Sequence, residues 1–409
     1  MAVTFVGVAI MIDYWYSRKV DLRLIIEKLL FVIPSIIIGI VQVKSVDASG
    51  TIAKSGLHTF YDKIGITCHN LLQYIWKLIV PINLSNFYPY PSLLPGQLPT
   101  DFYIAPAIVA VLAGLVIWSM KQTKIFFFCS GIFVATIVLV LQYVPVGPTM
   151  FSERYSLVPS IGLCFLIAYG INFLITKNNA LKIPLLALIG IYSAVLAYAT
   201  AQRCEVWQNS LTLWNNCIEQ FPTVSTALNN RGKYYGQTLN DLVSAERDLN
   251  ASIKYDPNYE LAYSNRGIVY SIQGKFDLAL ADFNMAVKLK PDYREAMHNR
   301  AIALAQMKRF DESMKDLDYL ISKWPNTSEN YQTRGMTLLQ LNKPQEGLND
   351  LNKAIQINPE LASAYTGRVQ AYFQLGRYND AKRELQFCQQ IGAQINPEFA
   401  KQVMNAPNQ

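Results

Sequence analysis

A periodic pattern of proline and arginine governs the second half of this 409-residue chain. The prolines are Pro222, Pro257, Pro291, Pro325 and Pro359, and the arginines are Arg231, Arg266, Arg300, Arg334 and Arg368. The two residue types recur at the same intervals, except that the first interval is longer by a single position. The period is about 34 residues, and a fixed period of this length predicts stacked units of two helices, which bury their apolar faces only against neighbouring units.

The clearest unit occupies residues 260–293 and divides into two predicted helices around a turn at 271–277. We expect small side chains where the two helices cross and aromatic side chains beside them. Glycine in the turn permits positive φ, and a closing proline ends the second helix because it lacks an N–H. These places are filled by Gly267, Ala279, Tyr270, Phe283, Ala286, Gly274 and Pro291. The pattern resembles the tetratricopeptide repeat (TPR).

Looser copies of the unit stay in register with it. They are 225–259, 294–327, 328–361 and 362–395, and 205–222 matches a lone second helix. We therefore predict about five and a half units in a TPR array at 203–395, followed by a tail at 396–409. The end units of a solenoid act as caps, so degenerate terminal copies are expected.

The first half of the chain is too apolar for an ordinary soluble domain. Hydrophobic residues make up 51% of the sequence and charged residues only 16%. Residues 1–202 carry 13 Lys+Arg against 7 Asp+Glu, whereas 203–409 carry 23 against 22. A basic excess confined to the apolar half indicates membrane orientation and not a nucleic-acid surface, so we expect no nucleic-acid partner.

A membrane domain is predicted at 1–202, with about six spans and a large outer loop at 44–101. The candidate spans are 1–16, 29–43, 102–120, 125–144, 159–176 and 183–201. The last four approach the ~20 residues that a bilayer requires, and Pro34 is tolerated inside a membrane helix. An amphipathic stretch at 64–82 suits a helix at the membrane interface. The predicted fold class is all-α: a multi-span membrane helix bundle followed by a TPR α-solenoid.

Basic residues predict the orientation of these spans. Lysines and arginines gather in the loops on one side, which the positive-inside rule places in the cytoplasm. They are Arg18, Lys19, Arg23, Lys28, Lys121, Lys124, Lys177 and Lys182. The repeat array then lies on the non-cytoplasmic side, which is the periplasm if the protein resides in a bacterial inner membrane. The alternative, cytoplasmic repeats, would place all these basic loops outside.

The stretch 151–170 is the most informative part of the membrane domain. Glu153, Arg154 and Tyr155 precede a span, where charges are costly unless paired or solvated. Arginine suits a phosphate because its planar guanidinium donates two hydrogen bonds at once. A Glu–Arg pair that merely caps the helix is an equal alternative.

This stretch, the loop 79–91, the helix 207–216 and the repeats together resemble the transmembrane and tetratricopeptide-repeat protein O-mannosyltransferases and their bacterial relatives. These are GT-C glycosyltransferases with an "ERY…PS" loop before the last spans. The resemblance covers nearly all of the chain. It implies that Arg154 contacts the phosphate of a polyprenyl-phosphate sugar and that Glu153 and Tyr155 support it.

The catalytic acidic residues of that family lie in the first non-cytoplasmic loop, and no acidic pair follows a first span here. Asp13 is cytoplasmic in the predicted topology, and the chain resembles the C-terminal part of the enzyme. We therefore expect this polypeptide not to transfer sugar by itself, and its catalytic residues are unknown.

The histidines and cysteines give little sign of a metal or cofactor. His58, Asp62 and His69 could meet on one helix face, but interfacial polar residues are the more ordinary interpretation. The six cysteines show no ligand spacing and are expected to be isolated buried thiols. We predict no metal and no cofactor.

Asparagine precedes the periodic arginine in three units, at Asn230, Asn265 and Asn299. We expect this position to face the concave groove, where amides could bond a peptide backbone without reading its side chains. Thr333 and Gly367 interrupt the row, so polar filler is the alternative.

Acidic residues follow the periodic arginines at a nearly constant offset. They are Asp248, Asp282, Asp316, Asp350 and Glu384. The offset places one charge on each helix of every unit, which predicts a ladder of Arg–carboxylate pairs. Partly exposed pairs add little stability, so we expect the ladder to set repeat register.

Two functions remain open from the sequence. One is the C-terminal part of a polyprenyl-phosphate-sugar-dependent protein glycosyltransferase, whose repeats bind the acceptor or a partner protein. The other is a non-enzymatic membrane scaffold that uses the repeats for protein–protein interaction in the cell envelope. A transporter is disfavoured, because no predicted span carries the charges that a substrate path needs.

Overall fold

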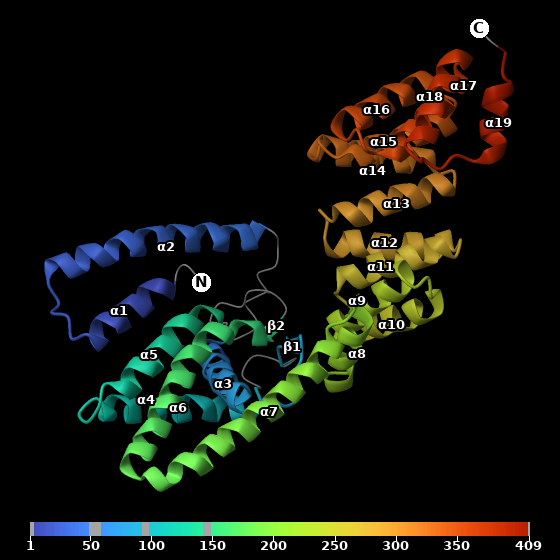
Figure 1. The fold of residues 1–409 in the computed structure, drawn as a ribbon. Coiled ribbons are helices and arrows are strands. Elements are labelled where there is room, and N and C mark those ends of the chain that lie inside the picture. Colours follow the sequence, from blue (N-terminus) through green and yellow to red (C-terminus); the bar gives the residue numbers. More distant parts are fainter. Residues whose placement is uncertain (1–3, 49–58, 92–97, 142–148, 408–409) are drawn as a thin grey trace. The chain divides into compact units, whose positions relative to one another are not determined.

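The computed structural model describes residues 4–48, 59–91, 98–141 and 149–407, which fold into helices with one short strand pairing (Figure 1). The chain divides into two compact units, Met1–Pro222 and Thr223–Gln409. The predicted boundary after residue 202 falls inside a helix, and each unit is described separately below.

The first unit contains the apolar helices. They are α1 (Phe5–Trp15), α2 (Leu22–Ala48), α3 (Phe60–Ile79), α4 (Thr100–Ser119), α5 (Ile125–Ile137), α6 (Leu157–Lys177), α7 (Lys182–Val206) and α8 (Ser210–Gln220). Among the described residues, four segments are long and apolar enough to cross a membrane: Leu22–Val41, Thr100–Ser119, Leu157–Lys177 and Asn179–Val206. Phe5–Trp15 and Ile125–Val140 are apolar but shorter. Six spans therefore stay a prediction.

Small residues bring the helices of this bundle close together. A Cβ on Gly162 of α6 would lie 2.5 Å from the carbonyl oxygen of Cys129 on α5. A Cβ on Gly65 of α3 would lie 2.9 Å from the carbonyl oxygen of Phe102 on α4. Close backbone approach at small residues is typical of membrane helix packing.

The long connection after α3 is tied to the segment before α6. Strand β1 (Tyr88–Pro89) pairs antiparallel with β2 (Thr149–Phe151). From α3, the buried Asn70 amide donates to the carbonyls of Leu141 and Met150 at 3.3 and 3.0 Å. These bonds join parts of the chain that are far apart in sequence and so position the 3₁₀ turn that follows β2.

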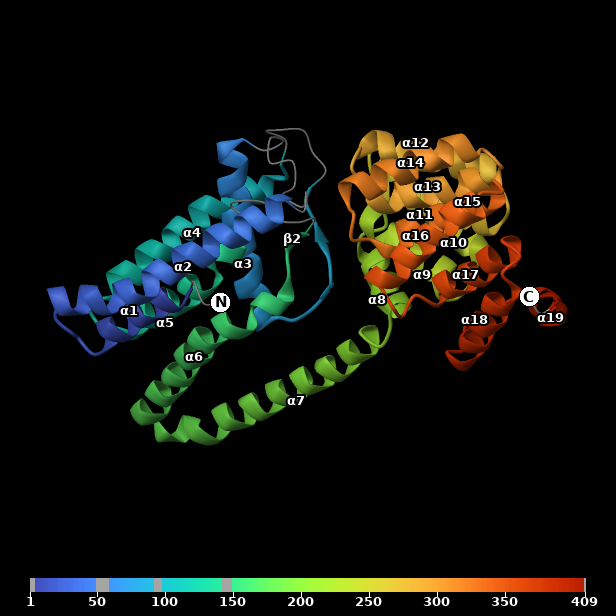
Figure 2. The ribbon, with the colours of Figure 1, turned by 90° about the horizontal axis from the view of Figure 1, so that it is seen from above.

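The second unit is a stack of helical hairpins (Figures 1 and 2). The first helices of the five pairs are α9 (Ser225–Gln237), α11 (Glu260–Ile272), α13 (Arg294–Gln306), α15 (Ser328–Gln340) and α17 (Ala362–Gln374). The second helices are α10 (Leu242–Tyr255), α12 (Phe276–Leu289), α14 (Phe310–Lys323), α16 (Pro344–Ile357) and α18 (Tyr378–Gln390). Consecutive first helices contact one another, and each also packs against its own second helix. The predicted two-helix units are confirmed.

Local sequence rules account for the hairpins. Gly274 adopts φ +73° in the turn of the clearest unit, as predicted. At the equivalent turn of the next unit, Lys308 takes φ 59°, a conformation that costs a non-glycine residue energy. Pro291 lies two residues beyond the end of α12, where the chain leaves the helix.

The helices that precede and follow the five hairpins pack against different units. Cys217 of α8 is fully buried, and Trp214 of α8 lies beside Phe87 of the first unit, with ring centroids 6.5 Å apart. Thus α8, which matched a repeat helix in sequence, belongs by its contacts to the first unit. The tail contains α19 (Pro397–Asn405), whose Val403 is fully buried against the last hairpin.

Candidate functional site

The predicted phosphate-contacting residues form one short 3₁₀ helix, Glu153–Tyr155, between β2 and α6. The side chain of Arg154 lies outside the described residues. Tyr155 packs at the edge of an aromatic cluster that contains Tyr74, Tyr88 and Phe151. The loop that carries Arg154 is therefore anchored on both sides of that residue.

Glu153 makes the polar contacts that hold this loop. Its carboxylate accepts hydrogen bonds from the Tyr88 hydroxyl and, at 2.9 Å, from the Ser85 backbone N–H. The guanidinium of Arg203 lies 3.8 Å from the same carboxylate. Burial raises the pKa of Tyr88, and the hydrogen bond and charge of Glu153 raise it further, so the hydroxyl stays protonated and donates. Glu153 thus braces the loop through its own side chain.

Two further cations, Lys77 and Arg203, lie beside Glu153, and the sequence analysis did not predict them. Lys77 donates to the carbonyls of Ile82 and Asn83 at 2.5 and 3.0 Å, and burial lowers its pKa against the opposing charge of Glu153. Arg203 donates to Asn216 at 2.8 Å, but its Nε and Nη2 groups are buried without a hydrogen-bond acceptor among the described residues. An arginine at the non-cytoplasmic end of the last predicted span was the available signal, because it departs from the positive-inside pattern.

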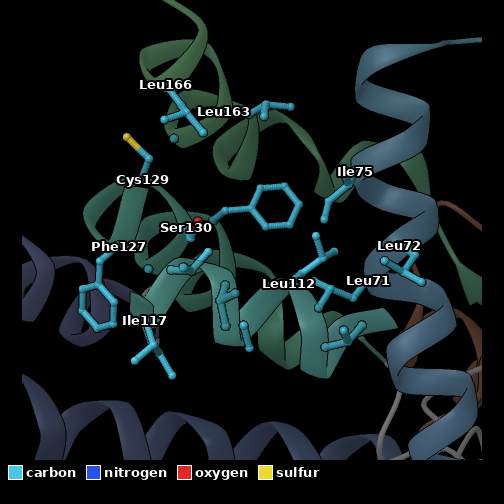
Figure 3. Close-up of a pocket in the computed structure, with 17 residues that line it drawn as sticks. Leu71, Leu72, Ile75, Leu112, Ile117, Phe127, Cys129, Ser130, Leu163 and Leu166 are labelled. Atoms are coloured by element: carbon cyan, nitrogen blue, oxygen red, sulfur yellow. The ribbon is translucent and has the colours of Figure 1, made fainter. Parts of the chain in front are cut away.

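A hydrophobic pocket of about 360 Å³ lies inside the same unit (Figure 3). It is formed by α3, α4, α5 and α6, and Ser130 contributes a hydroxyl to an otherwise mainly apolar lining. Figure 3 shows Leu71 and Ile75 of α3 facing Leu112 of α4 and Leu163 of α6 across it. Such a lining suits a hydrocarbon chain.

In the second unit, the second, sixth, ninth and thirteenth residues of each first helix are aligned on one side of that helix by their spacing. Most of these residues are exposed or half-buried, whereas Thr333 and Gly367 are buried. We call these positions the groove stripe. It consists of Thr226, Asn230, Lys233 and Gln237; Leu261, Asn265, Ile268 and Ile272; Glu295, Asn299, Ile302 and Gln306; Glu329, Thr333, Met336 and Gln340; Ser363, Gly367, Gln370 and Gln374.

The three predicted asparagines lie on the groove stripe and are half-buried. The amide of Asn265 donates to Asn229 at 2.8 Å, and Asn229 in turn donates to Asn230 at 3.1 Å. The bond between Asn265 and Asn229 therefore joins adjacent units. Contact of the three asparagines with a peptide stays a prediction.

The predicted arginine ladder is confirmed. Arg266 donates to both oxygens of Asp282 at 2.7 Å, and Arg300 makes the same pair with Asp316. Equivalent pairs are Arg231–Asp248, Arg334–Asp350 and Arg368–Glu384. Four arginines also reach the preceding unit, at Asn250, Asn284, Asp318 and Asn352. These acceptors recur with the period of the repeat, a signal that sequence reasoning overlooked.

The histidine-containing stretch on α3 serves other purposes. Asp62 caps α3 with Thr59 and accepts from the Tyr103 hydroxyl at 3.2 Å. His69 lies 3.3 Å from Asp101 and stacks on Phe102, and burial lowers its pKa. His58 lies outside the described residues, and within those described no group of three or more His, Cys, Asp or Glu could hold a metal ion.

Fold and site together define a class: an apolar helix bundle with membrane-spanning candidates that carries a repeat solenoid. Family models of the tetratricopeptide repeat match residues 261–293 and 328–361. The chain therefore contains TPR repeats.

Known proteins extend the comparison. The chain is similar to Protein O-mannosyl-transferase Tmtc2 of Drosophila melanogaster, at 24% identity over 131 residues, covering 29% of this chain and 13% of that protein. Among solved structures, YrrB, described as a TPR protein with an unusual peptide-binding site, is 17% identical with a TM-score of 0.37, covering 47% of this chain and 97% of YrrB. A TPR protein from Parabacteroides merdae is 20% identical with a TM-score of 0.41, covering 62% and 95%.

Proposed function

We propose that this is a membrane-anchored binding protein whose TPR groove holds an extended segment of a partner or acceptor protein. The supporting observation is the groove stripe, a set of mostly exposed or half-buried positions that recurs on the first helices of five consecutive hairpins. Its asparagines combine donors and acceptors that match a peptide backbone. TPR repeats are modules for protein interaction, and the similarity to Tmtc2, a protein O-mannosyl-transferase, supports an acceptor protein as one occupant.

The membrane domain, in this proposal, resembles the part of a glycosyltransferase that holds a polyprenyl-phosphate sugar. Arg154 would contact the phosphate from a loop that Glu153 braces and Tyr155 anchors. The buried N–H groups of Arg203 that lack an acceptor among the described residues would add positive charge nearby. The apolar pocket between α3 and α6 offers space for the hydrocarbon chain. In this proposal, the repeat array lies on the periplasmic side of a bacterial inner membrane.

A non-enzymatic scaffold is the second candidate, and the repeats support it because TPR units are protein-interaction modules. The scaffold would use the same groove without sugar transfer.

One experiment tests the groove and a second tests the lipid site. Partners captured by the detergent-solubilised protein should be lost from the triple variant Asn230→Ala, Asn265→Ala, Asn299→Ala. Each amide hydrogen bond contributes about 0.5–1.5 kcal/mol, so affinity should fall roughly ten- to a thousandfold. The matched control is Asn349→Ala, an exposed asparagine on the second helix α16. Unchanged capture by the triple variant would contradict the groove proposal.

For the lipid site, a fluorescent polyprenyl-phosphate sugar should bind the wild type and bind Arg154→Ala at least tenfold more weakly. Lys177→Ala, on the opposite predicted side of the membrane, is the charge-matched control. Equal binding by all three proteins would favour the scaffold, because that function needs no lipid phosphate.

A further inference from the structure

The charges and apolar groups of the groove stripe are unevenly distributed. Glu295 and Glu329 occupy the first turns of α13 and α15, and both side chains are exposed. Two turns further along each helix lie Ile302, which is 38% exposed, and Met336, which is half-buried. Ile268 continues this aliphatic row on the preceding first helix. The middle of the groove therefore has an acidic edge beside an aliphatic strip.

The two glutamates are equivalent residues of adjacent units. Because α13 and α15 contact each other, the distance between their axes is the ~8–10 Å of packed helices. His298 of α13 shares a hydrogen bond with the Thr333 hydroxyl of α15 at 2.9 Å. Burial lowers the pKa of His298, although the negative charges of Glu295 and Glu329 both act to raise it, so His298 adds no positive charge to this edge near neutral pH.

The other polar partners of the acidic edge are few among the described residues. Arg294 lies 3.1 Å from Glu295, with both side chains about half exposed, and the Ser328 hydroxyl donates to Glu329 at 3.0 Å. An exposed pair of neighbouring side chains is weak and exchanges readily with solvent. Because a hydroxyl does not neutralise Glu329, the charge of this carboxylate can attract a cationic ligand.

We propose, on the basis of the proposed peptide-binding function, that the groove selects an extended peptide with basic side chains three residues apart and aliphatic side chains beside them. A polyproline II strand has three residues per turn and a rise of ~3.1 Å, so residues i and i+3 lie on one side ~9 Å apart. This interval matches the spacing of adjacent first helices. The basic residues then face Glu295 and Glu329, while residues i+1 and i+4 face Ile302 and Met336.

Four fluorescent ten-residue peptides test this selectivity against the full chain in detergent. The first carries two lysines three apart, each followed by leucine, with glycine and serine elsewhere. The second replaces the lysines by glutamates, and the third replaces the leucines by serines. The fourth keeps the spacing of the lysines and has proline directly before the second lysine. We expect the first and fourth to bind best and the second to bind at least tenfold more weakly. Binding of the first should weaken as salt rises, because exposed charges are screened.

Variants assign the effect to the two glutamates. Glu295→Gln with Glu329→Gln should weaken the lysine peptide about 3- to 30-fold and leave the glutamate peptide no weaker. The control is Glu312→Gln with Glu346→Gln, which changes the same net charge in the same two units. Glu312 and Glu346 are exposed and occupy equivalent positions on the second helices α14 and α16. This control should bind like the wild type.

Arg294→Gln should act in the opposite direction. It removes the cation beside Glu295 and should strengthen binding of the lysine peptide about twofold to fivefold. Equal affinity for the lysine and glutamate peptides, together with no effect of the glutamine variants, would overturn the selectivity and leave peptide binding intact. No binding of any of the four peptides would overturn both the selectivity and the proposed groove.

Discussion

One arginine position links consecutive repeats. Its guanidinium joins three helices, because it pairs with the carboxylate of its own second helix and also reaches the preceding second helix. Arg266 shows this geometry with Asp282 at 2.7 Å and Asn250 at 2.6 Å. A planar group with five donors in a fixed fork can satisfy two acceptors at once, which lysine cannot do with the same geometry.

Removal of Asp282 should therefore destabilise the array. Asp282→Ala leaves the partly buried Arg266 without its two carboxylate acceptors, at a cost of about 1–3 kcal/mol in the free energy of unfolding. Asn250→Ala should cost less, about 0.5 kcal/mol, because that contact is exposed. The measurement is the loss of helical circular dichroism in urea.

The double variant Arg266→Met, Asp282→Ala provides the control. It removes the unpaired charge and should recover part of the stability lost in Asp282→Ala alone. If the double variant is no more stable than Asp282→Ala, an uncompensated guanidinium is not the cause of the loss.

At the scale of elements, each hairpin depends on a close crossing between its two helices. Helices α11 and α12 meet at Gly267, where an added Cβ would lie 2.7 Å from the ring of Phe283. Phe283 is itself almost completely buried between the helices and cannot move away freely. Protein interiors are packed closely, so extra atoms here must displace a helix.

Gly267→Leu should consequently unfold or severely loosen the array. Overpacking alone costs about 1–3 kcal/mol, and leucine is a better helix former than glycine, so any destabilisation reflects the crossing and not helix propensity. The comparison is a thermal melt against Ser363→Leu, which adds leucine at an exposed site on α17. A melt of Gly267→Leu that matches this control would contradict the tight crossing.

At the scale of the whole molecule, the charge asymmetry of the loops predicts the side of the membrane on which the repeats lie. Lys121 and Lys124 follow α4, and Lys177 and Lys182 flank the connection between α6 and α7. Positive loops remain in the cytoplasm, which would place the repeat array outside it.

Fusions of alkaline phosphatase in a bacterial host test this orientation. The enzyme needs disulfides that form in the oxidising periplasm, so it should be active after Gln409 and inactive after Lys124. Activity at the second fusion alone would show the reverse orientation, with the repeats in the cytoplasm.

Features that depend on neighbouring residues could be predicted from the amino-acid sequence alone. The repeat period, the hairpin turn at Gly274, the Arg–carboxylate ladder and the apolar helices follow from local periodicity, turn chemistry and hydropathy. Each of these signals is written within one or two helices, so no knowledge of distant contacts is required.

Contacts between segments that are distant in sequence could not be predicted in this way, because they depend on the folded chain. Glu153 is bonded to Tyr88 and Ser85, 65 and 68 residues earlier in the chain. Helix α8 matches a repeat helix in sequence but packs its buried Cys217 into the first unit. In both cases the pairing of β1 with β2 brings the distant segments together. Burial then favours contacts that satisfy a polar group or cover an apolar side chain.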